Sequence, residues 1–221
     1  SIILPLRHPA HVAKAAATAD VLSGGRVLLG VASGDRPEEY PAMAQTYPDR
    51  GARFRDSFGY IRAVGTDYPR HEAMQGHLPG GIDMLPKPTG ARLPLLITGG
   101  SQQSPDWVAE QGDGWMTYPR DPLSQGRVIA DYRARLVAAQ QPDKPVMQSL
   151  YIDLLEDADA PARPIHLGFQ SGTGVLRSYL REIEALGVNH VALNLRFNAA
   201  PVETTLKRLA DDLLADFSTQ G

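Results

Sequence analysis

The sequence predicts an α/β fold built around a parallel β-sheet. Short apolar runs alternate with helical segments along the chain about six times, and no turn signal joins two consecutive strands as a hairpin. Because parallel strands need a crossover between them, this alternation favours right-handed βαβ units. Two architectures follow from it, a doubly wound open sheet and an eight-unit (βα)8 barrel.

The amino-acid composition excludes several classes of function. The 221 residues are enough for one large domain, and we predict a single domain over 1–221 with a long loop or insertion at 66–94. The formal net charge of -3 gives no basic excess for nucleic acid, and the absence of Cys excludes disulfides and a cysteine nucleophile. No apolar run approaches the ~20 residues of a membrane span and no secretory leader is recognised, so we expect a cytoplasmic protein without nucleic-acid or membrane partners.

The elements of the N-terminal half follow from periodicity and from helix-stop residues. Apolar runs predict strands, and spacings of three and four predict helices, the clearer one carrying Phe54, Phe58 and Ile61 on its apolar side. One further short strand is predicted inside the long loop. The predicted ranges are strands at Ile2–Leu6, Arg26–Ala32 and Ile82–Leu85, and helices at Ala10–Leu22 and Asp49–Val64.

The same signals continue through the C-terminal half. A helix after Ser104 ends at Gly112, and a loop is predicted at Glu156–Gly168. The last helix is expected to turn Leu206, Leu209, Leu213 and Leu214 inward. The predicted ranges are strands at Leu95–Thr98, Trp115–Tyr118, Val146–Leu155 and His190–Phe197, and helices at Pro122–Gln140, Gly174–Leu186 and Pro201–Phe217.

A glycine turn joins the strand at Leu95–Thr98 to the helix that follows. Gly99, Gly100 and Ser101 form the turn, Ser104 suits the N-cap, and Pro105 suits the first helical position. Such a turn offers backbone N–H groups and the positive end of a helix dipole to a phosphate. An ordinary tight turn with a capping serine is the alternative, since neither a GxGxxG nor a GxxxxGK[ST] pattern is present.

Metal and nucleophile patterns are weaker. His71, Glu72, His77 and Asp83 lie in the long loop without the spacing of a metal site, so we interpret them as solvated and predict no metal. Ser101 lacks the GxSxG context of a hydrolase nucleophile.

Several motifs together resemble the luciferase-like flavin monooxygenase family. They are PLRHPAHVAKAAAT at 5–18, LSGGRVLLGVASGDRPEEY at 22–40 and RGARFRDSF at 50–58. DGWMTYPR at 113–120 and GVNHVALNLRF at 187–197 are similar to one bacterial luciferase-type oxidoreductase subfamily. The resemblance covers nearly all of the chain.

The resemblance implies a (β/α)8 TIM barrel of the luciferase-like type, with the N-terminal one to two and a half βα units absent from this chain. It implies an active site at the carboxyl ends of the strands. The cofactor implied is reduced FMN, or the deazaflavin F420 in sister enzymes. FMN with O2 would oxygenate a small organic substrate, with a flavin reductase as the source of reduced flavin.

The resemblance also implies the cofactor-binding residues. The phosphate is expected at Gly99, Gly100, Ser101 and Ser104, and a second turn at Ser33 and Gly34 is expected beside it. Some members carry Arg where Ser33 stands, so we assign the phosphate charge to Arg120, with a solvated loop arginine as the alternative.

No catalytic residue is identified outright. The main candidates are Tyr118, which is expected to contact the flavin or substrate, Tyr151, and Arg196. Asn194 and Arg196 alternate on one face, so in a barrel interior Arg196 would be a buried charge that needs an anionic partner. His8 precedes Pro9, and capping of the first helix is the alternative to a site role.

Two other functions stay open. In an F420-dependent enzyme the chemistry would be hydride transfer, because deazaflavin does not activate O2. A non-catalytic flavin-binding protein on a shortened barrel is the second alternative. Members of the family are often dimers, so the resemblance implies a homodimer.

Overall fold

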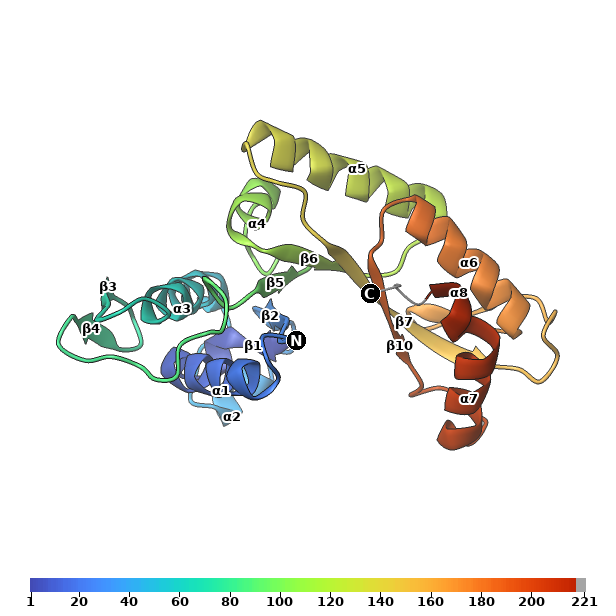
Figure 1. The fold of residues 1–221 in the computed structure, drawn as a ribbon, viewed down its shortest axis with the longest axis horizontal. Coiled ribbons are helices and arrows are strands. Elements are labelled where there is room, and N and C mark those ends of the chain that lie inside the picture. Colours follow the sequence, from blue (N-terminus) through green and yellow to red (C-terminus); the bar gives the residue numbers. More distant parts are fainter. Residues whose placement is uncertain (218–221) are drawn as a thin grey trace. The chain divides into compact units, whose positions relative to one another are not determined.

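A computed structural model describes residues 1–217. The chain forms two compact units (Figure 1). The first holds residues 1–115 and 138–144, and the second holds residues 116–137 and the chain from Pro145 onward. The single domain over 1–221 stays a prediction.

The first unit contains a parallel sheet. β1 pairs with β2 and β2 pairs with β5, both in parallel, and β5 is followed in the sheet order by β6, which passes into the second unit. Its elements are β1 (Ile2–Ile3), a 3-10 helix (Leu4–Leu6), α1 (Pro9–Leu22), β2 (Leu29–Ala32), α2 (Glu39–Ala42), α3 (Arg50–Val64), β3 (Arg70–Glu72), β4 (His77–Pro79), β5 (Leu95–Thr98), α4 (Pro105–Gln111) and β6 (Gly114–Thr117).

Packing in the first unit places α3 against α1. Phe54, Phe58 and Ile61 of α3 are buried as the helical spacing predicted. The predicted strand at Ile2–Leu6 is shorter than expected, because Pro5 opens a 3-10 turn in which its missing N–H costs nothing.

The 66–94 segment contains two short strands that the sequence did not indicate. β3 and β4 pair antiparallel with Arg70 opposite Pro79, so the expectation of no hairpin is wrong. Ile82–Leu85, the predicted strand, lies outside both. The end of the segment is anchored by the buried Asp20 of α1, whose carboxylate accepts a 2.8 Å hydrogen bond from the Thr89 backbone N–H.

The second unit is organised around one long strand. β7 pairs in parallel with β10 through residues 147–151 and with β9 through residues 151–154. α5 and α6 lie along one face of this sheet (Figure 1). Its elements are α5 (Pro122–Ala138), β7 (Val146–Leu154), β8 (Arg163–Ile165), β9 (Gly168–Ser171), α6 (Thr173–Ala185), β10 (His190–Asn194), α7 (Val202–Leu209), a π-helical turn (Ala210–Leu214) and α8 (Ala215–Phe217).

The predicted loop Glu156–Gly168 contains β8, the first strand of a second hairpin. β8 pairs antiparallel with β9, with Ile165 opposite Gly168 and Pro164 opposite Phe169. β8 stands at the end of the strand order, where the missing N–H of Pro164 breaks no interior pairing.

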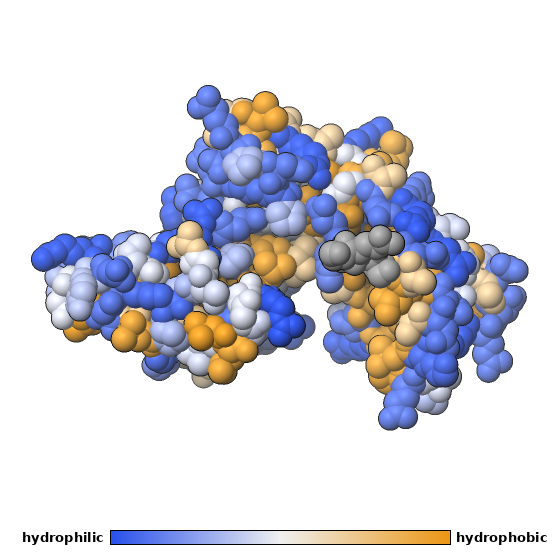
Figure 2. Space-filling view, viewed as in Figure 1, coloured by the Kyte–Doolittle hydropathy of each residue, from blue (hydrophilic) through white to orange (hydrophobic). Residues whose placement is uncertain are grey.

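The last helix differs from its prediction. A π-helical turn over Ala210–Leu214 interrupts the 3.6-residue register. Leu213 is buried at 4% exposure as predicted, whereas Leu206 and Leu214 are 54% and 62% exposed, so their inward assignment is wrong. They line an apolar groove beside β10, and Figure 2 shows hydrophobic surface over β10 and α7.

Among residues 1–217, no helix is both long and apolar enough to cross a membrane.

Candidate active site

The ends of two neighbouring parallel strands bring two predicted turns to one edge of the first unit. Leu29 of β2 lies opposite Leu95 of β5, and Val31 lies opposite Ile97. Ser33 comes directly after β2, and Gly99 comes directly after β5. Both residues therefore lie at the same carboxyl edge of the sheet. This is the edge at which parallel α/β sheets bind ligands.

The turn after β5 has a left-handed backbone. Gly99, Ser101 and Gln102 have φ angles of 55°, 45° and 62°. Glycine adopts this conformation without steric cost, whereas Ser101 and Gln102 adopt it against their preference. Left-handed residues other than glycine are concentrated at functional sites, so this turn is the most distinctive backbone feature of the edge.

The two serines that were predicted to bind the phosphate make different hydrogen bonds. The Ser101 hydroxyl donates to the Thr98 carbonyl oxygen over 2.8 Å, so its hydrogen is already used inside the turn. The Ser104 hydroxyl accepts from the Trp107 backbone N–H over 3.2 Å, which confirms Ser104 as the N-cap of α4. An accepting hydroxyl keeps its own hydrogen available to a ligand.

Gln103 and Arg55 complete this turn, and sequence reasoning missed both. The Gln103 amide donates to the Gly51 and Ser101 carbonyl oxygens over 2.8 and 3.1 Å. Arg55 of α3 donates to the Gln103 side-chain oxygen through two nitrogens at 2.9 and 2.8 Å. A guanidinium charge therefore stands beside the turn. The one available signal was that Arg55 belongs to the RGARFRDSF segment of the resemblance.

The second predicted turn is tightly packed. Ser33 is buried, and its carbonyl oxygen accepts a hydrogen bond from the Tyr40 hydroxyl. Gly34 has a φ of 77°, and a Cβ there would lie 2.8 Å from Cγ2 of Ile3. Burial raises the pKa of the Tyr40 phenol, which keeps it protonated as the donor of this bond.

Arg120 belongs to the second unit and is held by its own segment. One guanidinium nitrogen donates to the Thr117 hydroxyl at 2.7 Å, to the Tyr118 carbonyl oxygen at 2.9 Å and to the Gln125 side-chain oxygen at 3.1 Å. Its role as the phosphate partner stays a prediction. In the first unit, Arg55 supplies the positive charge at the turn after β5.

The tyrosine candidates differ in their surroundings. Tyr118 follows β6 and is 45% exposed. Tyr151 lies in β7, and its ring centroid is 5.9 Å from that of His166 and 5.1 Å from that of Phe197. His166, in the β8–β9 turn, and Phe197 were not identified from the sequence, because pairing between distant strands brings them to Tyr151.

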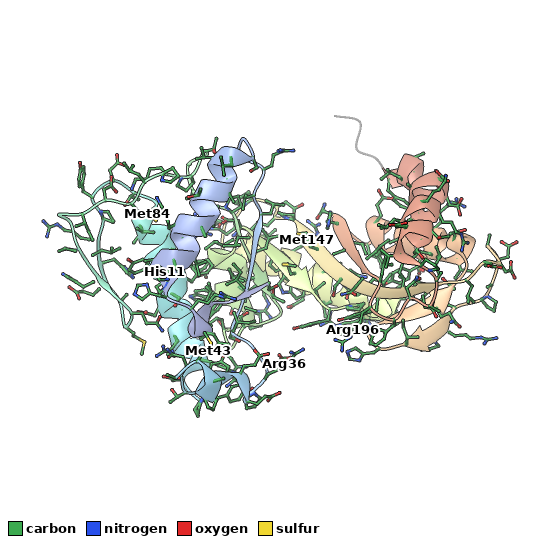
Figure 3. All side chains as sticks on the ribbon, turned by 90° about the horizontal axis from the view of Figure 1, so that it is seen from below. His11, Arg36, Met43, Met84, Met147 and Arg196 are labelled. Carbon is green, nitrogen blue, oxygen red and sulfur yellow. The ribbon has the colours of Figure 1, made fainter. Side chains whose placement is uncertain are left out.

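Arg196 is exposed and follows the end of β10 (Figure 3). The Asn194 side-chain oxygen accepts a 2.9 Å hydrogen bond from the Arg196 backbone N–H. The buried charge considered for Arg196 is therefore absent from this structure, and its catalytic role stays a prediction. His8 accepts from the Ala10 N–H at 3.3 Å, which confirms the capping alternative.

One histidine of the long loop makes a local contact. His77 Nδ1 lies 2.9 Å from a Glu72 carboxylate oxygen across the β3–β4 hairpin, and both side chains are exposed. Within residues 1–217, no three His, Cys, Asp or Glu side chains group as metal ligands.

The alignments with relatives of known sequence cover only part of this chain and only part of each relative. An uncharacterized protein of Mycobacterium tuberculosis is 36% identical over 128 residues, which is 58% of this chain and 43% of that protein. The F420-dependent hydroxymycolic acid dehydrogenase of the same organism is 29% identical over 135 residues, 60% of this chain and 37% of its own length. This chain thus spans less than half the length of these relatives.

Solved structures share the fold. The monooxygenase RslO1 from Streptomyces bottropensis has a TM-score of 0.81 at 18% identity, over 99% of this chain and 77% of that one. The oxygenating constituent of 3,6-diketocamphane monooxygenase from Pseudomonas putida, solved with FMN, has a TM-score of 0.57 at 17% identity, over 70% of this chain and 48% of that one. The α/β fold is therefore that of luciferase-like TIM-barrel structures, while the absence of N-terminal units stays a prediction.

The family described as luciferase-like monooxygenase matches residues 1–221. The match spans the strand ends, the glycine turn and the motifs that carry the resemblance. The chain belongs to the luciferase-like monooxygenase family of oxidoreductases.

Proposed function

We propose that this chain is a flavin-dependent oxidoreductase that uses reduced FMN and O2 on a small organic substrate. The observation that carries the proposal is the left-handed turn after β5 in a chain of this family. The turn stands at the carboxyl edge of the parallel strands, where TIM-barrel enzymes place their active sites.

The residues of the turn fit a phosphate group. The Ser104 hydroxyl has a hydrogen to donate while it caps α4, and the Arg55 guanidinium adds positive charge through its contact with Gln103. A Cβ added at Gly100 would come no closer than 3.7 Å to another heavy atom, so the outer side of the turn is open. We assign the phosphate to Ser104, Arg55 and the turn backbone, with Ser101 stabilising the turn.

FMN, when bound, supplies the reaction of reduced flavin with O2 that oxygenates a substrate. This chain's part is to hold and orient the cofactor and to shape the substrate pocket. Tyr118 is proposed to contact the flavin or substrate, and Tyr151, with His166 and Phe197, to form an aromatic surface for the substrate.

The second candidate is F420-dependent hydride transfer. The observation that favours it is the name of the mycobacterial relative, an F420-dependent dehydrogenase. F420 also carries a phosphate, so the same turn would serve either cofactor, and affinity must distinguish them. A non-catalytic flavin-binding protein is the third candidate.

A fluorescence titration of the 221-residue protein with FMN and with F420 tests the proposal. We expect saturable FMN binding that Ser104→Ala weakens about tenfold and Arg55→Met weakens by a similar factor. Arg181→Met is the matched control, since Arg181 of α6 is exposed and pairs with Glu184. Tighter binding of F420 than of FMN would move the assignment to hydride transfer.

Formation of an oxygenated product separates an enzyme from a flavin-binding protein. With a flavin reductase, NADH and FMN present, the enzyme proposal expects an oxygenated product that forms only when both the substrate and this protein are added. Saturable FMN binding without any oxygenated product across a panel of small aldehydes, ketones and sulfonates would favour the binding protein.

A further inference from the structure

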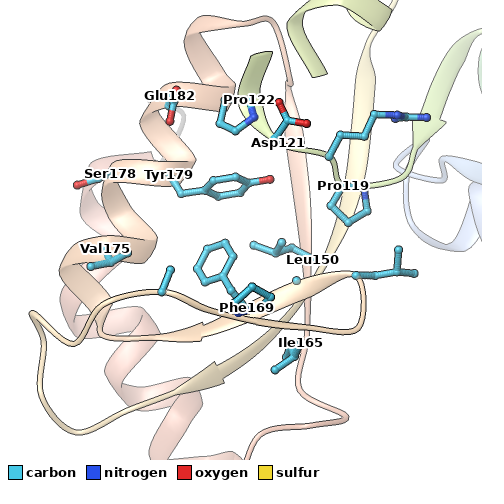
Figure 4. A pocket seen from close by; sticks show the side chains of 15 residues that line it. Pro119, Asp121, Pro122, Leu150, Ile165, Phe169, Val175, Ser178, Tyr179 and Glu182 are labelled. Carbon is cyan, nitrogen blue, oxygen red and sulfur yellow. The ribbon is translucent and has the colours of Figure 1, made fainter. Parts of the chain in front are cut away.

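The second unit contains a pocket on the helix-facing side of its sheet. The pocket has a volume of about 670 Å³ and lies between α6, the segment after β6 and the β8–β9 hairpin. Figure 4 shows Tyr179 projecting from α6 beside Phe169, with Pro119 and Asp121 across the pocket. The volume is within the range of pockets for small organic ligands.

The pocket is separate from the candidate substrate surface at Tyr151. Successive side chains of a strand point to opposite faces of the sheet. In β7, Gln148 and Leu150 are buried on the helix side, whereas Tyr151 points to the other face with His166 and Phe197. Leu150 lines the pocket and Tyr151 does not.

Most of the wall is apolar or aromatic. The Phe169 and Tyr179 rings meet edge to face at 5.1 Å and 79°. Such a wall suits a flat apolar ring, because aromatic faces and edges offer large contact area at little entropic cost. Leu150, Ile165 and Val175 are among the other apolar residues of the wall.

A buried hydrogen-bond chain reaches the pocket. Arg120 donates to the Gln125 oxygen at 3.1 Å, the Gln125 amide nitrogen donates to the Gln148 oxygen at 2.9 Å, and the Gln148 nitrogen donates to the Tyr179 hydroxyl at 2.9 Å. Gln125 and Gln148 are 0% and 1% exposed, so solvent cannot substitute for any of these partners.

The donor-to-acceptor direction of these hydrogen bonds is fixed by Arg120. A guanidinium can only donate, so Gln125 must present its oxygen to Arg120 and its nitrogen to Gln148. Gln148 is oriented in the same way, and the Tyr179 hydroxyl is left to accept. Within residues 1–217 no acceptor is found for the hydrogen of the Tyr179 hydroxyl, which faces the pocket. Burial raises the pKa of the Tyr179 phenol, so this hydrogen is retained at neutral pH.

We propose that this pocket is a second ligand site, separate from the aromatic surface at Tyr151, for a neutral apolar ring compound that carries a hydrogen-bond acceptor such as a ketone carbonyl. The ring packs on Phe169 and Tyr179, and the acceptor receives the Tyr179 hydrogen. The site goes beyond the proposed function and does not depend on it.

The charges at the pocket select against anions. Asp121 and Glu182 line it together with Arg120. Hydrogen bonding from the Ser124 backbone lowers the pKa of Asp121, which keeps its carboxylate charged. Two carboxylates and one guanidinium leave a negative balance, so a neutral acceptor is favoured over a carboxylate or phosphate.

The probe is prodan, a neutral naphthalene dye that bears a propionyl carbonyl and whose emission shifts to the blue in apolar surroundings. We expect saturable binding with a blue shift. Tyr179→Phe should weaken it about two- to tenfold, the value of one hydrogen bond, and Tyr68→Phe, at an exposed tyrosine of the first unit, should not change it. Ser178→Trp, at an exposed α6 position lining the pocket, should abolish binding, while Thr204→Trp on α7 should not.

A competition assay tests whether the hydrogen-bond acceptor of the ligand contributes to binding. Acetylnaphthalene should displace prodan at lower concentration than ethylnaphthalene, which has the same ring without the carbonyl. Equal displacement by both, no saturable binding to the wild-type chain, or binding unchanged in Tyr179→Phe and in Ser178→Trp would each overturn the proposal. Circular dichroism confirms that each variant is folded.

Discussion

The indole nitrogen of Trp115 donates a 3.0 Å hydrogen bond to the carbonyl oxygen of Gly99. The first residues of β6 thereby hold the turn that follows β5, the turn to which we assign the cofactor phosphate. The Trp115 side chain, which comes from one predicted strand, thus fixes the backbone of the predicted phosphate site.

Trp115→Phe should loosen this turn. The ring is retained in part, but Gly99 loses its donor, so we expect a loss of about 1 kcal/mol of unfolding free energy and weaker FMN binding. Tyr60→Phe is the control, because the buried Tyr60 ring of α3 packs on His8 and His71 and not on the turn. Urea unfolding and FMN titration measure the two effects. FMN affinity equally reduced in both variants would contradict a specific role for the Trp115–Gly99 bond.

Gly34→Ala should destabilise the chain by more than Gly24→Ala. Both glycines have a left-handed backbone, at φ angles of 77° and 68°, and a Cβ costs about 1–2 kcal/mol there. A Cβ at Gly34 also lies 2.8 Å from the Ile3 side chain, whereas a Cβ at Gly24 meets no heavy atom within 4 Å. Thermal unfolding compares the pair, and equal losses would show that the contact with Ile3 is relieved without cost.

Asp20→Asn should remove part of the acid sensitivity of folding. Hydrogen bonds from Thr89 and Val27 lower the pKa of Asp20 in the folded state, so its stabilisation is present above the unfolded value of about 3.9 and is lost as the pH falls through the folded value. The variant should be less stable than wild type at neutral pH, and the difference should shrink below about pH 4. Urea unfolding at several pH values measures this. A difference that is the same at every pH would refute it, and Asp35→Asn, at an exposed position, is the control.

Gln125→Leu and Gln148→Leu should be costly alone and less costly together. Each single change leaves a buried amide group of its partner unpaired, at about 1–3 kcal/mol of unfolding free energy. The double variant removes both ends of that bond, so its cost should be less than the sum. Additive losses in a double-mutant cycle would mean that the two amides do not depend on each other.

Local chemistry allowed much of the fold to be predicted. The Ser104 cap with Pro105 and the strand Leu95–Thr98 need only neighbouring residues, and both are confirmed, with Leu95, Leu96 and Ile97 buried. The β8–β9 hairpin was missed because Pro164 argues against a strand unless it is known to lie at an edge.

The candidate site was less predictable. Gln103 and Arg55 are 48 residues apart, and no local pattern indicates that they bond. The same holds for Tyr151 and His166, which meet because β9 pairs with the end of β7. Glycine turns and caps are local features, whereas the side chains that surround them come from distant segments.

The most direct test of the central claim is the affinity of the 221-residue protein for FMN compared with riboflavin. The two differ only in the phosphate, so they isolate the site assigned to the turn after β5. We predict that FMN binds at least about tenfold more tightly, and that Ser104→Ala combined with Arg55→Met removes most of this difference. Equal affinity for FMN and riboflavin, or a preference for FMN that survives both substitutions, would contradict the assignment.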